Sequence, residues 1–174
     1  MEKENIAVGL DIGTTKIVAM IGKKNEYGKL EILGVGKAKS LGVARGVVIN
    51  IMQTTQSIQE AIALAEADSG YKIKDVVVGI AGQHIRSMQH SEYISRSNFE
   101  EVISAEDIEL LINQVQKLNV LPGEEIIHVL PQEFKIDGQS ETNEPIGMYG
   151  RRLESSFHVV LGQASSIRNI GRCV

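Results

Sequence analysis

The stretch of residues 9–16 constrains the fold of this chain more than any other. It follows an alternating run in which Ile6, Val8 and Leu10 are apolar, and a second apolar run, 17–21, comes directly after it. Such runs are typical of β-strands. The stretch therefore predicts two strands joined by a tight turn, and this turn carries an acid, a glycine, two hydroxyls and a lysine.

The groups in this turn suit the phosphates of a nucleotide. The glycine allows the backbone to approach an anion because it has no Cβ, while the hydroxyls and the lysine supply donors and positive charge. The acid has no use for bare phosphate, and we expect it to hold a hydrated Mg²⁺ through water. The candidate cofactor-binding residues are Asp11, Gly13, Thr14, Thr15 and Lys16, with Asp11 as the indirect metal ligand.

A plain β-hairpin explains the same residues. Aspartate accepts local backbone hydrogen bonds and glycine adopts positive φ, so Asp-x-Gly-Thr is good turn chemistry without a ligand. The residues of the turn alone leave both interpretations open. The chain has neither Gly-x-x-x-x-Gly-Lys-Ser/Thr nor a Gly-x-Gly-x-x-Gly that opens a helix, which disfavours a P-loop and a Rossmann site.

Composition narrows the class of protein. The chain has 174 residues, of which 43% are hydrophobic, enough for one ordinary domain or two small ones. Its net charge of -4 is mild and its basic residues are scattered, which argues against a nucleic-acid partner. Cys173 is the only cysteine, which indicates a reducing compartment. No apolar run is long enough to span a bilayer, so we expect a cytoplasmic protein.

The first part of the chain predicts a β-β-β-α-β unit. A third strand is expected over 29–39, and a helix begins after Asn50 as N-cap and ends at Gly70. The apolar run within 74–81 is typical of a strand covered on both faces. The expected buried face of the helix carries Ile51, Thr55, Ile58, Ile62 and Ala65.

The following residues predict a smaller α+β unit. A polar strand is expected over 85–97, and a capping box at Ser104 starts a helix with an apolar stripe. Two longer strands are expected over 124–137 and 151–161, the second with one buried face. The last residues, from Ser165, show a short helical pattern that runs to the end of the chain.

Seven segments of the chain carry a resemblance to a known family. They are 8–16, 45–48, 78–82, 128–134, 145–148, 150–151 and 152–154. In order and spacing these segments together resemble the FtsA family of bacterial cell-division proteins, and the turn itself is similar to the first phosphate loop of the wider actin, Hsp70 and sugar-kinase superfamily. The resemblance implies an α/β fold, a partial actin-like (ribonuclease H-like) mixed sheet with an inserted small α+β domain. The expected domains are 1–82, the inserted 83–162, and 163–174 as a truncated return to the first.

The resemblance also implies a function. A complete FtsA-like protein binds ATP with Mg²⁺, polymerises, anchors FtsZ to the inner face of the cell membrane and recruits late divisome proteins such as FtsN. It is a scaffold with at most weak ATPase activity, and its inserted domain mediates contacts between protomers and with partners. The family's second phosphate loop, adenine pocket and membrane helix lie in its carboxy-terminal half. Because only one side of the nucleotide would be held, we expect weak or undetectable ATP binding by this chain alone.

Two other functions remain as alternatives. A fragment of an ATP-dependent sugar or acetate kinase would need a general base and a sugar-recognition loop with aromatic groups. Aromatic residues make up only 4% of the chain, there is no Trp, and no acid is better placed as a base than the others. An actin-like pilus or secretion adaptor shares the phosphate loop and an inserted domain, but segments 128–134 and 147–154 favour the FtsA family over it.

Overall fold

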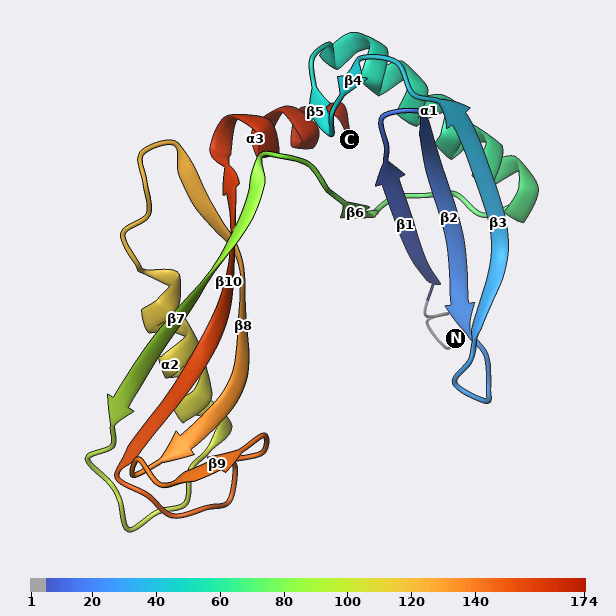
Figure 1. Ribbon diagram of the computed structural model, residues 1–174. Coiled ribbons are helices and arrows are strands. Elements are labelled where there is room, and N and C mark those ends of the chain that lie inside the picture. Colours follow the sequence, from blue (N-terminus) through green and yellow to red (C-terminus); the bar gives the residue numbers. More distant parts are fainter. Residues whose placement is uncertain (1–5) are drawn as a thin grey trace. The chain divides into compact units, whose positions relative to one another are not determined.

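The computed structural model describes residues 6–174 and divides the chain into two compact units (Figure 1). The first unit contains the described residues up to His84 together with Ser165–Val174, and the second is Ile85–Ala164. Residues 1–5, which belong to the first expected domain, lie outside the described residues. Within 6–174, no helix has the length and apolar character needed to cross a membrane.

The first unit is built on a four-stranded sheet in the order β3-β2-β1-β6. Neighbouring strands are antiparallel except for β1 and β6, which are parallel. Its strands are β1 (Ile6–Ile12), β2 (Lys16–Lys24), β3 (Leu30–Lys39), β4 (Val43–Ala44), β5 (Val47–Val48) and β6 (Val77–Gly79), and its helices are α1 (Ile51–Ser69) and most of α3 (Ala164–Cys173).

Alternation along β1 and β2 separates a core face from an outer face. Leu10 and Ile12 are buried while Asp11 between them is exposed, and Ile17 is buried while its neighbour Lys16 is exposed. Because Ile12 pairs with Ile17, the apolar residues of the two strands share one face. The hairpin expected from the sequence is therefore present, with its polar residues on the outer face and at the tip.

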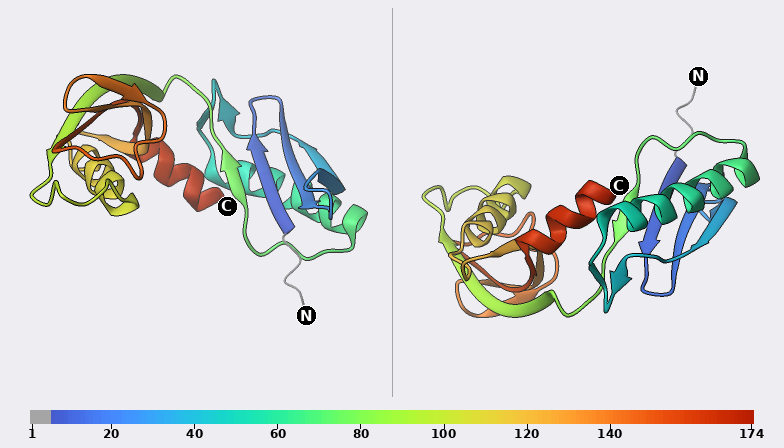
Figure 2. Two further views of the ribbon diagram at one scale, coloured as in Figure 1. Left: turned by 90° about the horizontal axis from the view of Figure 1, so that it is seen from below. Right: turned by 90° about the horizontal axis from the view of Figure 1, so that it is seen from above.

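Helix α1 lies along the core face of the sheet (Figure 2). Its expected caps are confirmed, since Asn50 Oδ1 accepts a hydrogen bond from the Gln53 N–H at 3.1 Å and Gly70 has φ 74°. The helix sits so close to β3 that a Cβ at Gly36 would lie 1.8 Å from the Ala61 oxygen. The expected face packs against the core through Ile51, Ile58, Ile62 and Ala65, and small residues that were not expected fill the closest contact. The buried residues are Thr54, Ser57, Ile58, Ala61 and Ala65, while Ile51, Thr55 and Ile62 are half-buried.

Two features of this unit differ from the sequence expectation. The short strands β4 and β5 form a hairpin that was not predicted, with Arg45 (φ 51°) and Gly46 (φ 77°) as its two-residue turn. The strand expected within 74–81, with both faces covered, is the shorter β6, and the Val77 side chain within it is 75% exposed. A continuous apolar run therefore predicted the strand but not its burial.

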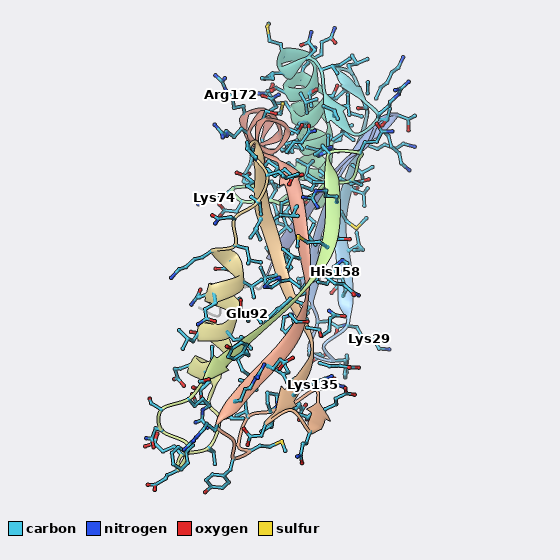
Figure 3. The ribbon with its side chains drawn as sticks, turned by 60° about the vertical axis from the view of Figure 1, so that its left-hand side comes forward. Lys29, Lys74, Glu92, Lys135, His158 and Arg172 are labelled. Atoms are coloured by element: carbon cyan, nitrogen blue, oxygen red, sulfur yellow. The ribbon has the colours of Figure 1, made fainter. Side chains whose placement is uncertain are left out.

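The second unit has one helix and a four-stranded antiparallel sheet in the order β7-β10-β8-β9. Its core includes Phe157 and Leu153 from β10 and Leu111 from the helix, and all three are fully buried. The opposite face of the sheet carries polar side chains such as Lys135 and His158 (Figure 3). The elements are β7 (Ile85–Ser95), α2 (Ala105–Gln116), β8 (Glu124–Ile136), β9 (Ser140–Thr142) and β10 (Arg152–Gln163).

Candidate functional site

The tip of the β1–β2 hairpin brings together all five candidate residues. The last strand pair is Ile12 with Ile17, and the loop closes when the Gly13 N–H donates to the Lys16 oxygen at 3.1 Å. Thr14 and Thr15 therefore form the bend itself. The tip places two hydroxyls and an ammonium group within a few residues of one another.

These polar groups face solvent. Asp11, Thr14, Thr15 and Lys16 are exposed and Gly13 is half-buried. Within residues 6–174, neither the Asp11 carboxylate nor the Lys16 ammonium group takes part in an ion pair. The loop is held by backbone bonds, so its side chains are available to a ligand.

Gly13 is needed for space rather than for an unusual backbone conformation. It is not among the glycines with left-handed φ in the described part of the chain, so the positive φ of the plain-hairpin interpretation is wrong. A Cβ built on Gly13 would lie 2.8 Å from the Lys16 oxygen, closer than real Cβ atoms come. Any side chain here would open the loop.

Asp11 lies at the end of β1 beside a second glycine. It is the register partner of Gly79 on the parallel strand β6. A Cβ at Gly79 would stand 3.9 Å from Asp11 Oδ1. Since Gly79 has no side chain, the space next to the carboxylate stays open on the β6 side.

Sequence reasoning missed the neighbours that β3 supplies to this tip. The Ser40 N–H donates to the Thr15 oxygen at 3.1 Å, and Lys39 is the register partner of Lys16. The signal was present in Lys37-Ala38-Lys39, where an apolar residue separates two lysines at the end of a strand. Without the register, nothing in the sequence placed them beside the turn.

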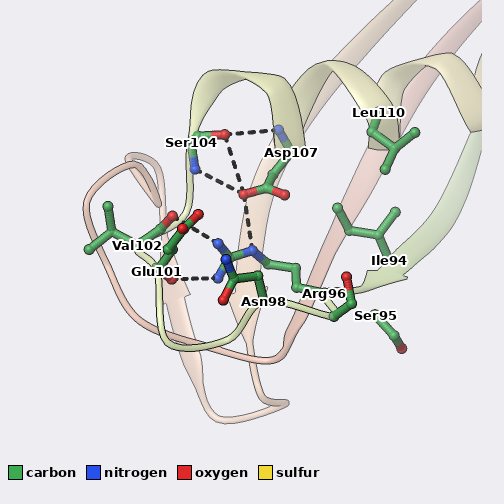
Figure 4. Close-up of a pocket in the computed structure, with 10 residues that line it drawn as sticks. Ile94, Ser95, Arg96, Asn98, Glu101, Val102, Ser104, Asp107 and Leu110 are labelled. Carbon is green, nitrogen blue, oxygen red and sulfur yellow. Dashed lines mark hydrogen bonds and ion pairs between the residues drawn. The ribbon is translucent and has the colours of Figure 1, made fainter.

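A concave region lies in the other unit, beside Arg96 (Figure 4). Its volume is about 230 Å³, and Arg96 Nε contacts Asp107 Oδ2 at 3.0 Å. The remaining guanidinium nitrogens donate to the backbone oxygens of Glu101, Val102 and Gly150. Because its donors are already used within the chain, this arginine holds loops together and offers little to a ligand.

Cys173 is a core residue, as expected. It is 2% exposed, and its Sγ lies 3.8 Å from the Ile51 oxygen. Burial raises the pKa of the Cys173 thiol, which keeps it protonated and disfavours nucleophilic chemistry.

Comparisons with known proteins agree with the sequence resemblance. Residues 82–161 match the family model described as the SHS2 domain inserted in FtsA. All 174 residues align with the cell division protein FtsA of Pseudomonas aeruginosa at 39% identity, covering 41% of that protein. The chain is a relative of FtsA. The FtsA proteins of Borreliella burgdorferi and Escherichia coli strain K12 are 37% and 30% identical to it, over 98% and 97% of the chain.

The chain spans about two fifths of the length of these FtsA proteins. Its fold is similar to that of a chain in the PilM-PilN type IV pilus biogenesis complex, with a TM-score of 0.59 over 96% of this chain and 43% of that chain. At 11% identity this likeness concerns the fold alone. The expected fold class, a partial actin-like α/β sheet with an inserted domain, is confirmed.

Proposed function

We propose that this chain is part of an FtsA-like cell-division scaffold whose β1–β2 tip holds the terminal phosphates of ATP. The observation that carries the proposal is the exposure of Thr14, Thr15 and Lys16 at the tip. The loop that presents them is closed by the hydrogen bond from the Gly13 N–H to the Lys16 oxygen. An inward-facing, sealed tip would have argued against it. Thr14 and Thr15 donate hydrogen bonds to the β and γ phosphates, and Lys16 supplies charge.

Asp11 fits a hydrated Mg²⁺. Its carboxylate is exposed and has no cationic partner within residues 6–174, and Gly79 leaves space beside it. Mg²⁺ keeps several of its water molecules and is bound by few protein carboxylates together with the phosphates of a substrate. When bound, the ion neutralises part of the phosphate charge, and Asp11 orients it.

The wider role that we propose is the one implied by the resemblance to the FtsA family, and the similarity to cell division proteins FtsA supports it. In the complete protein, nucleotide sets the conformational state, protomers polymerise, and the assembly anchors FtsZ at the inner face of the cell membrane. The unit Ile85–Ala164 supplies contacts to other protomers and to late divisome proteins such as FtsN. The protein acts as a scaffold with at most weak ATPase activity.

Nuclear magnetic resonance of this chain tests the nucleotide site. Mg-ATP at millimolar concentration is expected to shift the backbone amides of residues 13–16, with a dissociation constant on the order of 1 mM because only one side of the nucleotide is held. Lys16→Ala is expected to weaken these shifts, while Lys24→Ala, an exposed lysine at the opposite end of β2, leaves them unchanged. Shifts that avoid residues 13–16, or equal effects of the two variants, would refute the proposal.

A further inference from the structure

Lys39 lies beside the proposed phosphate site. It is the last residue of β3 and the register partner of Lys16, the first residue of β2. The next backbone group, the Ser40 N–H, bonds to the Thr15 oxygen at 3.1 Å and ties the end of β3 to the tip. Residues directly opposite on antiparallel strands have Cβ atoms about 5 Å apart. Two ammonium groups therefore share the same edge of the tip.

This pairing is unfavourable unless an anion is present. Like charges directly opposite each other on two strands destabilise a sheet. Lys16 and Lys39 are both exposed, and neither is in an ion pair among the described residues. The neighbouring pair of Ile17 and Ala38 is buried, so both lysines point to the outer face.

Core packing does not explain the choice of lysine. The tight contact with α1 restricts the inward positions of β3, where Gly36 and Ala38 are buried. Lys39 points the other way and touches none of this packing. Its charge is free to serve a ligand on the outer face.

We propose that Lys39 is a second cationic contact for the polyphosphate, acting together with Lys16. This inference rests on the proposed nucleotide site and extends it. Bound triphosphate, with several negative charges, converts the repulsion between the two ammonium groups into attraction to a shared anion. The flexible four-carbon stem of lysine allows Lys39 to reach a phosphate held at the tip.

Lysines on an edge strand also have a simpler use, since they prevent unwanted strand pairing. β3 is an edge strand, and it carries an exposed Lys37 as well as Lys39. Lys37 points to the same face but is opposite Val18, one pair further from the tip on that face. Edge protection treats the two lysines alike, whereas phosphate binding requires Lys39 to matter more.

The experiment compares Lys39→Ala with Lys37→Ala by titrating each chain with Mg-ATP and following the amides of residues 13–16. Lys39→Ala is expected to raise the dissociation constant about three- to fivefold, the upper range for an exposed charge pair. Lys37→Ala is expected to change it less than about twofold, and Lys39→Arg retains binding. Inorganic triphosphate should show the same order, because the contact concerns phosphate and not the base.

The outcomes separate this inference from the function on which it rests. Shifts that depend on Lys16 but are unaffected by Lys39→Ala overturn the role of Lys39 and leave the nucleotide site standing. Equal weakening by Lys37→Ala and Lys39→Ala also overturns it, because general surface charge then explains the effect. If Mg-ATP shifts amides elsewhere in the unaltered chain but not those of residues 13–16, the nucleotide site and the role of Lys39 fall together.

Discussion

The hairpin tip of the first unit and the Arg96 loop of the second use polar residues in opposite ways. At the tip, Asp11 and Lys16 are exposed and have no ionic partner within residues 6–174. In the loop, the Arg96 side chain is 6% exposed and donates to Asp107 and to three backbone oxygens. Both regions look polar in the sequence, yet one keeps its groups free and the other uses them to hold backbone.

This difference distinguishes side chains that are available to bind a ligand from side chains that stabilise the fold. Asp107 makes three contacts, since it accepts from the Ser104 N–H at 3.0 Å and the Ser104 hydroxyl at 3.5 Å in the capping box and also binds Arg96. A side chain committed in this way cannot be replaced without breaking several hydrogen bonds at once. A side chain such as Lys16 can be changed at little cost to the fold, and any effect of its loss then reports on a ligand.

Replacing Arg96 should therefore have the largest effect on stability. Arg96→Met keeps the apolar stem but removes the ionic partner of Asp107 and the donors to three backbone oxygens, and we expect the free energy of unfolding of the second unit to fall by about 3 kcal/mol. Denaturant unfolding followed at the amides of β10 measures this loss.

Arg152→Met is the matched control for Arg96. Arg152 binds Glu154 at 2.9 Å, but its side chain is 48% exposed, so less than about 1 kcal/mol should be lost. Equal losses in the two variants would remove the distinction between a buried and an exposed arginine.

Gly36→Ala tests how much the close contact between β3 and α1 contributes to the stability of the first unit. The new Cβ would lie 1.8 Å from the Ala61 oxygen, so α1 must move away from β3, at a cost of about 1–3 kcal/mol or more. Gly9→Ala is the control, because a Cβ there meets nothing within 4 Å. Urea denaturation of the two variants gives the comparison, and a loss as large for Gly9→Ala would contradict it.

How far the sequence predicts the molecule depends on whether the deciding interaction is local. The capping box at Ser104 and the N-cap at Asn50 were predicted correctly because residues three apart make them. The small buried residues of α1, such as Ala61, were missed because the close approach of α1 to Gly36 joins two different elements. The exposure of Val77 was missed because burial depends on what packs over a strand.

In the candidate site, too, local features could be predicted and contacts between distant parts of the chain could not. Its turn residues could be identified because they are contiguous, from Asp11 to Lys16. Gly79 and Lys39 belong to other strands, and only the register brings them to the tip. The network around Arg96 was not predicted, since its acceptors include the backbone oxygen of Gly150, 54 residues away.

Thr14→Ala should have a small effect on stability if the comparison is sound. Thr14 is exposed at the bend and its hydroxyl holds nothing in place, so the free energy of unfolding should change by less than about 0.5 kcal/mol. The same variant is expected to weaken the amide shifts caused by Mg-ATP. A loss of stability above about 1 kcal/mol would mean that the tip is built like the Arg96 loop.

The smallest effect on stability is expected when a charged hydrogen bond that is partly exposed to solvent is removed. The Glu66 carboxylate in the first unit makes such bonds. Hydrogen bonds from Lys72 Nζ at 2.6 Å and the Ile73 N–H at 2.8 Å lower the pKa of Glu66 from its usual 4.5. Because the folded pKa is the lower one, the ionised carboxylate stabilises the fold above about pH 4.5, and this stability is lost as the pH falls through the lowered pKa. The melting temperature of Glu66→Gln should therefore lie slightly below that of the unaltered chain at pH 7, and the gap should close in acid. A gap that stays constant with pH would mean that the Glu66 contacts act through shape and not through charge.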